Sequence, residues 1–351
     1  MSRPTQTAVE RRQLLARLLP DGVPPLWCPL ITHYDRDGAI DQQRVTAHLR
    51  HLSPYVKGFL VPGSTGDGWE LTDAETRRLL EVVIEQTTKL KLHLLIGALK
   101  TEGAAALQAI EETIEWIGAR TLDGLLENNL TRAGVCGFTI CPPRGKDLSQ
   151  QQLGSALRGI LEKQAPVAIY QLPQVTQNEM SPELVADLAR QFPNFILFKD
   201  TSGADRVALS GQKLENVFLV RGAEGDYIRW LKIVRGPYDG FLLSSANGFA
   251  RELHEIIEGL RVRRVKAAQE RSEQLTSCIN EVFGVVTGLP QGNPFANANK
   301  AVDHFFAFGP KAKDAPPPRL HAGVSLPADV IHATGDALSR HGLMPEKGYL
   351  E

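Results

Sequence analysis

The 351-residue chain has only four cysteines, and none of them belongs to a Cys-x-x-Cys pair. They are Cys28, Cys136, Cys141 and Cys278. Such spacing is typical neither of a zinc site nor of the dense disulfide frameworks of small secreted domains. The sequence therefore predicts reduced thiols and a cytoplasmic location.

A surplus of either charge is also missing. The chain has 39 lysines and arginines against 40 aspartates and glutamates, which gives a formal net charge of -1 and a pI near 6.8. Without a basic surplus, the composition does not support nucleic acid or an anionic membrane as a partner. We therefore expect a small molecule as the ligand.

Long apolar runs are missing as well. No stretch approaches the roughly 20 uninterrupted apolar residues that a membrane-spanning helix needs. The N-terminal segment RRQLLARLLPDG is basic and then apolar, but its apolar run is short, is interrupted by Arg17 and lacks a small-residue cleavage site. This segment predicts a short amphipathic helix or a frayed arm.

What the sequence does contain is an alternation of short apolar runs with segments of helical periodicity. Eight such runs occur, at residues 26–32, 58–63, 92–98, 137–143, 167–173, 195–200, 217–223 and 240–247. Most are continuously apolar, as expected for parallel strands covered on both faces. Eight strand and helix units predict a closed (β/α)8 TIM barrel. A doubly wound open sheet fits less well, because no glycine-rich dinucleotide fingerprint follows the first run.

The segments between the runs carry clear helix starts. Thr72 and Glu75 form a capping box, and Ser181 precedes a proline at a first helical position. The link at 119–134 is longer than its neighbours and could shape an interface or a lid.

After residue 250 the strand signal disappears, and the chain indicates helices joined by a proline-rich connection at 315–327. We therefore expect three parts. They are an N-terminal arm (1–22), a catalytic barrel (23–255) and a C-terminal helical extension (256–351).

In barrels of this type the active site lies at the carboxyl ends of the strands, so the last residues of each run are the candidates for chemistry. These ends supply Gly63 to Asp67 after the second run, Tyr170 at the fifth, Lys199 at the sixth, Gly222 to Glu224 at the seventh, and Ser245 and Asn247 at the eighth.

Lys199 ends a run of four apolar residues, FILF. An amine at the mouth of an apolar barrel is partly desolvated, which lowers its pKa toward the range in which it attacks a ketone to form a Schiff base. The residues alone leave two structural alternatives open: an ion pair with Asp200 or another carboxylate, and a side chain that reaches out to water.

Tyr170 ends the neighbouring run, and adjacent parallel strands lie about 4.8 Å apart, so its phenol and the Lys199 amine could face one substrate. A phenol can pass protons to and from a carbinolamine. A core tyrosine with a satisfied hydroxyl is the alternative. The hydroxyls and backbone N–H groups of Gly63–Asp67 suit a carboxylate, although a plain turn would also explain this stretch.

Four segments together resemble the dihydrodipicolinate synthase / N-acetylneuraminate lyase superfamily. They are GSTGD at 63–67, YQLP at 170–173, FKDTSG at 198–203 and SSAN at 244–247. The resemblance runs from about residue 24 to 345 and includes GNPFANANKAVDHFFAFG in the C-terminal helices.

The resemblance implies that Lys199 forms an imine with a 2-oxo acid, that Tyr170 shuttles protons, and that Ser64 and Thr65 hold the acid's carboxylate. It implies no metal and no cofactor, and relatives in this family are commonly tetramers or dimers. The full set of expected substrate-binding residues is Gly63, Ser64, Thr65, Arg144, Gly222, Glu224, Ser245 and Asn247.

Several positions depart from the synthases of that family. Val175 lies where they carry a carboxylate-binding arginine, and Pro143 and Arg144 lie where they carry a tyrosine pair. Arg144 is an anion clamp or a solvated loop residue. Trp69 is an aromatic wall for a substrate tail or a core residue under the loop. Glu224 falls near the acidic residue that binds sugar hydroxyls in the neuraminate lyases.

The sequence thus predicts a metal-independent Schiff-base lyase that cleaves or forms a carbon-carbon bond next to pyruvate or a related 2-oxo acid, with an aldehyde or sugar acid as co-substrate. Close alternatives are a 2-keto-3-deoxy sugar acid dehydratase, a hydratase-aldolase and dihydrodipicolinate synthase itself. A keto-acid-binding barrel without activity, or a phosphate- or metal-dependent barrel enzyme, would be a different class. A homotetramer or homodimer is expected.

Overall fold

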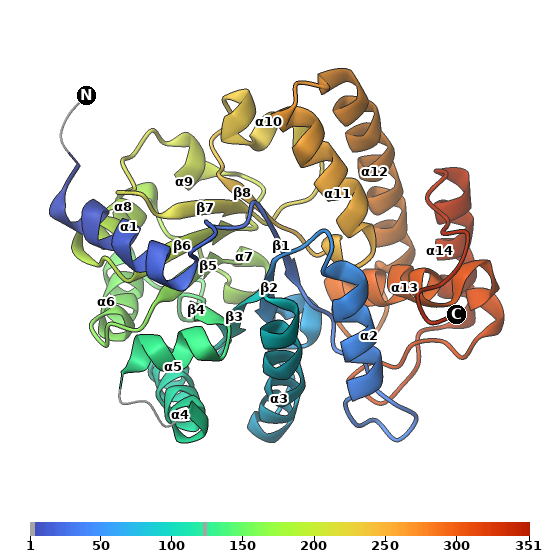
Figure 1. Cartoon of the computed structure of the whole chain (residues 1–351), viewed down its shortest axis with the longest axis horizontal. Coiled ribbons are helices and arrows are strands. Elements are labelled where there is room, and N and C mark those ends of the chain that lie inside the picture. The colour runs from blue at the N-terminus through green and yellow to red at the C-terminus, as the bar shows by residue number, and fades with distance from the viewer. Residues whose placement is uncertain (1–3, 122–124) are drawn as a thin grey trace. The chain divides into compact units, whose positions relative to one another are not determined.

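The computed structural model describes residues 4–121 and 125–351. Eight parallel strands form one closed barrel in chain order (Figure 1). They are β1 (Leu26–Pro29), β2 (Gly58–Val61), β3 (His93–Gly97), β4 (Val135–Ile140), β5 (Val167–Gln171), β6 (Phe195–Asp200), β7 (Phe218–Arg221) and β8 (Gly240–Leu242). Each strand overlaps one predicted run, and nearly every strand residue is buried. The predicted TIM barrel is confirmed.

The chain divides into two compact units. The first unit comprises the N-terminal segment up to Pro25, His93–Ala223 and Trp230–Leu242, and the second comprises Leu26–Leu92, Glu224–Arg229 and Leu243–Glu351. The short helix α10 (Tyr227–Trp230) contains residues of both.

The first unit contains strands β3 to β8 and the helices between them. These are α4 (Gly103–Thr121), α5 (Leu126–Arg132), α6 (Gln150–Leu161), α7 (Pro173–Thr176), α8 (Pro182–Gln191), α9 (Arg206–Leu209) and the 3-10 turn η2 (Lys232–Val234). The predicted start of α8 is confirmed, since Ser181 accepts a hydrogen bond from Leu184 N and Pro182 is the first helical residue. In the long link, α5 packs against α4. Residues 122–124 of this link lie outside the described residues.

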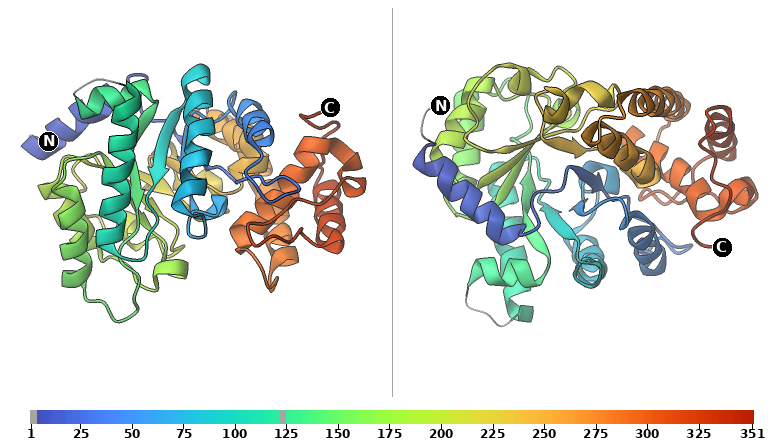
Figure 2. Two further views of the ribbon diagram at one scale, coloured as in Figure 1. Left: turned by 90° about the horizontal axis from the view of Figure 1, so that it is seen from below. Right: turned by 45° about the horizontal axis from the view of Figure 1, so that its top comes forward.

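The N-terminal segment forms α1 (Gln6–Leu18), which lies against α8 and β6 (Figure 2). One arginine of this helix, Arg11, is fully buried. Its guanidinium donates to the carbonyls of Phe195 and Ala189 at 2.6 Å, to that of Phe192 at 2.7 Å, and to that of Glu215. Burial lowers the pKa of Arg11 to about 10, so the group stays charged at neutral pH. Arg11 therefore ties α1 to the start of β6.

The second unit contains β1, β2 and two helices that follow them, α2 (Gln42–Leu52) and α3 (Asp73–Leu90). The capping box at the start of α3 is present, because Thr72 and Glu75 exchange side chain to backbone hydrogen bonds. Between the two strands, the ring of Trp27 covers Gly58, where a Cβ atom would lie 2.3 Å from the indole. Only glycine permits this approach.

The rest of the second unit is helical. It contains α11 (Ala246–Arg261), α12 (Val265–Val286), α13 (Pro294–Phe308), the 3-10 turn η3 (Gly309–Asp314) and α14 (Ala328–Arg340), with the predicted proline-rich connection between η3 and α14. Helices α12, α13 and α14 pack on one another (Figure 2). Among the described residues, no helix is both long and apolar enough to cross a membrane.

Candidate active site

Lys199 and Tyr170 lie side by side at the carboxyl ends of β6 and β5. The two residues are paired in the register of β5 and β6, and residues paired across two parallel strands point to the same face of the sheet. The Lys199 Nζ lies 3.9 Å from the centroid of the Tyr170 ring, and the two residues are 4% and 3% exposed. The pair that the sequence predicted is thus a buried amine over the face of a phenol.

Gly222, the residue after β7, leaves space for this lysine. A Cβ atom there would lie 2.8 Å from the Lys199 Cε and 2.3 Å from the Thr201 Oγ1. Separations below 3.0 Å essentially never occur for real Cβ atoms. Glycine at position 222 therefore leaves room for the Lys199 and Thr201 side chains.

Two side chains near Lys199 were missed in the sequence. The Thr201 Oγ1 is buried without a hydrogen-bond partner in the part of the chain that the structure describes. Burial raises the pKa of the Cys141 thiol, and the charge of Lys199 opposes this rise, which places the thiol near the amine. The period of two in a strand was the available signal for Thr201, because residue 201 follows Lys199 on the same face.

Arg144 is an exposed residue of the loop after β4. Its backbone N–H donates to the Thr101 carbonyl at 2.8 Å. The loop is held by the Asn178 amide, which donates to the carbonyls of Pro143 and Gly145 at 2.7 and 2.9 Å. The backbone of this loop is fixed while the Arg144 side chain reaches solvent.

In the second unit, the Gly63–Asp67 loop follows β2 and contains the 3-10 turn η1 (Ser64–Gly66). The Ser64 Oγ accepts a hydrogen bond from the Trp69 indole N–H at 2.7 Å, and the Ser64 carbonyl accepts from the Asn293 amide at 3.0 Å. Ser64 and Thr65 are both buried. Trp69 is half-buried, and its hydrogen bond fixes the Ser64 hydroxyl.

The end of this loop is held by a buried ion pair. The Lys300 Nζ on α13 lies 2.8 Å from the Asp67 Oδ2, and the Tyr34 hydroxyl donates to the same oxygen at 3.0 Å. Asp67 has a φ of 60°, in the left-handed region. Burial lowers the pKa of Lys300, and Asp67 opposes this. Sequence reasoning missed Lys300, which is 233 residues from Asp67.

Glu224 and Ser245 are joined in one hydrogen-bond cluster. The Glu224 carboxylate accepts from the Ser244 hydroxyl at 2.9 Å, from the Ser245 N–H and hydroxyl at 3.0 and 2.7 Å, and from the Tyr227 hydroxyl at 2.9 Å. Burial and the nearby Glu224 raise the pKa of Tyr227, so its hydroxyl remains a donor. The orientation of the carboxylate is therefore fixed by neighbouring protein groups.

Asn247 is fully buried, and its side chain binds backbone groups. The amide oxygen accepts from Ile31 N at 2.9 Å, and the amide nitrogen donates to the carbonyls of Pro29 and Ser244 at 2.9 Å. These bonds connect the end of β1 to the loop after β8. In this unit Asn247 has a structural task that its place after the eighth run did not indicate.

Among the described residues, one group of metal-ligand type brings its ligand atoms within 4.8 Å of one another, namely His33, His48 and Asp303. The His33 Nε2 lies 3.1 Å from the His48 Nδ1, and the His48 Nε2 lies 2.8 Å from the Asn247 carbonyl. Asp303 accepts from Arg44 at 2.7 Å and from Tyr349 at 2.9 Å. The group is a hydrogen-bonded network that reaches from Tyr349 to Asn247.

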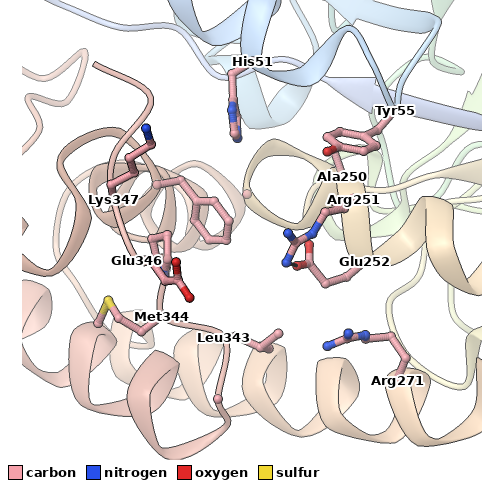
Figure 3. A pocket seen from close by; sticks show the side chains of 14 residues that line it. His51, Tyr55, Ala250, Arg251, Glu252, Arg271, Leu343, Met344, Glu346 and Lys347 are labelled. Atoms are coloured by element: carbon pink, nitrogen blue, oxygen red, sulfur yellow. Dashed lines mark hydrogen bonds and ion pairs between the residues drawn. The ribbon is translucent and has the colours of Figure 1, made fainter. Parts of the chain in front are cut away.

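A separate pocket of about 490 Å³ lies beside the segment 342–347 (Figure 3). Arg251 and Glu252 project into it from α11, and Arg271 comes from α12. Arg251 binds the buried Glu252 carboxylate at 3.1 Å, and Arg271 lies 3.4 Å from Glu255. Both arginines are therefore paired with carboxylates of α11.

Comparisons with known proteins agree with the fold. A sequence model of the Dihydrodipicolinate synthetase family matches residues 25–291. A relative named 4-hydroxy-tetrahydrodipicolinate synthase, from Symbiobacterium thermophilum, is 23% identical over 278 residues, which are 75% of this chain and 87% of that protein. Another of this name, from Bartonella henselae, is 26% identical over 176 residues, and the match spans only 54% of its length and 50% of this chain.

Among the solved structures that are similar to this chain is YagE, a prophage protein of the dihydrodipicolinic acid synthase family from E. coli K12, in complex with pyruvate. The similarity has a TM-score of 0.71 with 19% sequence identity and covers 91% of this chain and 99% of YagE. At that identity the similarity supports the fold.

Proposed function

The chain belongs to the dihydrodipicolinate synthetase family, and on that premise we propose that it is a lyase in which Lys199 forms an imine with a 2-oxo acid such as pyruvate. One observation carries the proposal: the buried Lys199 amine lies 3.9 Å from the centroid of the Tyr170 ring, at the strand ends where barrel enzymes have their active sites.

The mechanism starts with addition of the neutral Lys199 amine to the keto carbon. Loss of the keto oxygen as water leaves an imine whose protonated nitrogen draws electrons from the adjacent carbon. Cleavage of the bond two atoms away then gives an enamine and an aldehyde, and protonation of the enamine followed by hydrolysis releases the 2-oxo acid and the free amine. The Tyr170 hydroxyl carries the protons that these steps require.

For the carboxylate of the 2-oxo acid, we propose the Gly63–Thr65 stretch as the binding site. Its support is chemical: buried hydroxyls and backbone N–H groups of a tight turn suit an anion. The other expected substrate-binding residues, namely Gly222 and Arg144 of the first unit and Glu224, Ser245 and Asn247 of the second, stay predictions from the sequence. The Glu224 carboxylate already accepts four hydrogen bonds from protein groups, so its contact with the hydroxyls of a sugar-like chain is proposed from the resemblance alone.

Retro-aldol cleavage is the preferred reaction, ahead of dehydration of a 2-keto-3-deoxy sugar acid and of hydratase-aldolase action on an aromatic substrate. The synthase reaction ranks lower, because Val175, Pro143 and Arg144 replace the residues expected for it. A homotetramer or homodimer in the cytoplasm belongs to the same proposal, and neither a metal nor a cofactor is part of it.

The decisive experiment is to incubate the protein with pyruvate, reduce it with borohydride and locate the added mass by peptide mass spectrometry. We expect the adduct on Lys199 and its loss in Lys199→Ala. Lys146→Ala, at an exposed lysine, is the matched control and keeps the adduct. A folded protein that forms no adduct with pyruvate or longer 2-oxo acids would overturn the lyase proposal in favour of a keto-acid-binding barrel.

Once the adduct is found, the reaction follows from product analysis. 2-Keto-3-deoxy sugar acids are offered to the enzyme, and release of pyruvate is followed against loss of water. Pyruvate release that is absent from Lys199→Ala supports retro-aldol cleavage, whereas dehydration alone selects the dehydratase alternative.

A further inference from the structure

A pocket of about 530 Å³ in the second unit lies among residues that the proposed function does not use. It is surrounded by the loop after β1, the first turn of α2, the second half of α13 and the segment 316–325. Its volume is within the range of about 300–1,000 Å³ that small-molecule sites occupy. The charge and the hydrogen-bonding capacity of its walls indicate the class of ligand that it suits.

The basic side chains of the wall outnumber the acidic ones. The basic residues are Arg36, Arg44, Lys300 and Arg319, and the acidic residues are Asp35 and Asp41. Both acids already accept backbone hydrogen bonds. The Asp35 Oδ1 accepts from the N–H groups of residues 37 and 39 at 2.9 Å, and the Asp41 Oδ1 accepts from that of Arg44 at 2.9 Å. Both acids are thus held in local backbone turns, and the basic side chains remain in excess on the wall.

The two innermost arginines, by contrast, have unused donors. Of the five N–H groups of a guanidinium, Arg44 uses one to bind Asp303 at 2.7 Å, and Arg319 uses one to bind the Arg36 carbonyl at 2.9 Å. Among the described residues, the Nε atoms of both arginines are buried without a partner. In the part of the chain that the structure describes, the other guanidinium N–H groups of these two arginines bind no protein group and are not buried, so this wall suits a ligand that brings acceptor oxygens.

The remaining wall is aromatic and proline surface together with the polar residues His33, His304 and Ser325. Tyr34, Phe308 and Pro316–Pro318 line it, and the Arg44 guanidinium lies 5.0 Å from the centroid of the Phe308 ring. A guanidinium beside aromatic and proline surfaces can bind a planar acid through both its charge and its apolar body. We propose that this pocket binds a small organic anion, a carboxylate on an aromatic or other apolar body.

Occupancy of the pocket would reach the Gly63–Asp67 loop through two of its lining residues. Tyr34 and Lys300 line the pocket, and both bind the Asp67 Oδ2, at 3.0 and 2.8 Å. An anion near the Lys300 ammonium competes with Asp67 for that charge. The proposed ligand is thus an effector of the loop that, under the proposed function, holds the 2-oxo acid.

The test uses benzoate as the probe, with its neutral analogue benzamide as the control ligand, in isothermal titration calorimetry of the full chain. Benzoate is expected to bind and benzamide is not. Arg319→Gln should weaken benzoate binding by about tenfold or more, because it removes a charged hydrogen bond. Arg261→Gln, at an exposed arginine of α11, is the matched control and leaves the affinity unchanged. Equal melting temperatures establish that both variants are folded.

Pyruvate separates this pocket from the proposed catalytic site. In protein that forms the borohydride-trapped adduct, saturating pyruvate should change the benzoate Kd severalfold and then have no further effect, as for two coupled sites. A Kd that rises in proportion to pyruvate without limit would place benzoate at the catalytic site and overturn the proposal, as would affinity unaffected by Arg319→Gln or no binding at all. A Kd independent of pyruvate would overturn the coupling. Benzoate binding requires no turnover, so its outcome tests the pocket independently of the proposed Lys199 imine.

Discussion

Replacement of Arg11 by methionine is expected to destabilise the first unit strongly. The methionine keeps an apolar stem in the same space, while the guanidinium and its bonds to four backbone carbonyls are lost. Leaving one buried polar group unpaired costs about 1–3 kcal/mol. Removing one partner of a buried charged interaction costs about 3–5 kcal/mol.

Two considerations limit the size of this effect. The carbonyl of Phe192 also accepts from Phe195 N, so it retains a donor in the variant. The lowered pKa of Arg11 shows that burial of the charge opposes the gain from its hydrogen bonds, and that cost disappears with the guanidinium. We therefore expect a loss of about 3 kcal/mol, at the lower end of the range for broken buried charges.

The assay is equilibrium urea unfolding followed by circular dichroism, with thermal melting as a second measurement. A loss of about 3 kcal/mol corresponds to a fall of roughly 6–12 °C in Tm. Arg12→Met is the matched control, since Arg12 is exposed on the same helix and its replacement should change stability by less than about 0.5 kcal/mol. Equal stability of the two variants would refute the view that Arg11 holds α1 to β6.

Three further predictions concern the proposed site and the response to pH. Gly222→Ala places a Cβ atom 2.8 Å from the Lys199 Cε and should slow pyruvate trapping at least about tenfold. Gly159→Ala is the control and should not slow trapping, because no atom lies within 4 Å of the added Cβ. Equal trapping rates of the two variants would contradict the steric role of Gly222. Tyr170→Phe keeps the ring beside Lys199 and should still permit trapping, but turnover should fall about 10²- to 10⁴-fold; undiminished kcat would remove the tyrosine from proton transfer. Burial, with smaller effects of His48 and Arg251, lowers the pKa of His51 to about 4. The unfolded chain therefore binds more protons between pH 6.5 and 4, stability falls with acidification across that window, and His51→Gln should reduce the slope of unfolding free energy against pH by up to about 1.4 kcal/mol per pH unit. An unchanged slope would contradict this assignment.

The barrel could be predicted because each strand has a local signal. Every strand is a short apolar run bounded by turn residues. Because both faces of the strands are buried, the runs are continuously apolar and do not alternate with polar residues. The pairing of Tyr170 with Lys199 also followed, because strands adjacent in sequence are adjacent in this fold and end at similar heights. What lies at the end of a strand is therefore accessible to sequence reasoning.

The contacts that were missed join residues far apart in sequence. Lys300 reaches Asp67 across 233 positions, and Arg11 reaches Phe195 across 184. Lysine and arginine on helices ordinarily indicate a solvated face, and only tertiary structure places these two in the interior. The hydrogen bonds of Asn247 to the end of β1 were hidden for the same reason, since the sequence indicated the position of this residue and not its partners.

The composition of the second unit determines the order in which it can be completed during synthesis. Its strands β1 and β2 are made early, but the helices α11 to α14 and Tyr349 come roughly 200–290 residues after β2. At typical translation speeds, Tyr349 emerges about 15–60 s after β2. During that interval the apolar residues of the early strands lack the partners that bury them. The yield of folded protein should therefore depend on translation rate and on chaperones that shield β1 and β2 until α11, which packs on β1, is complete.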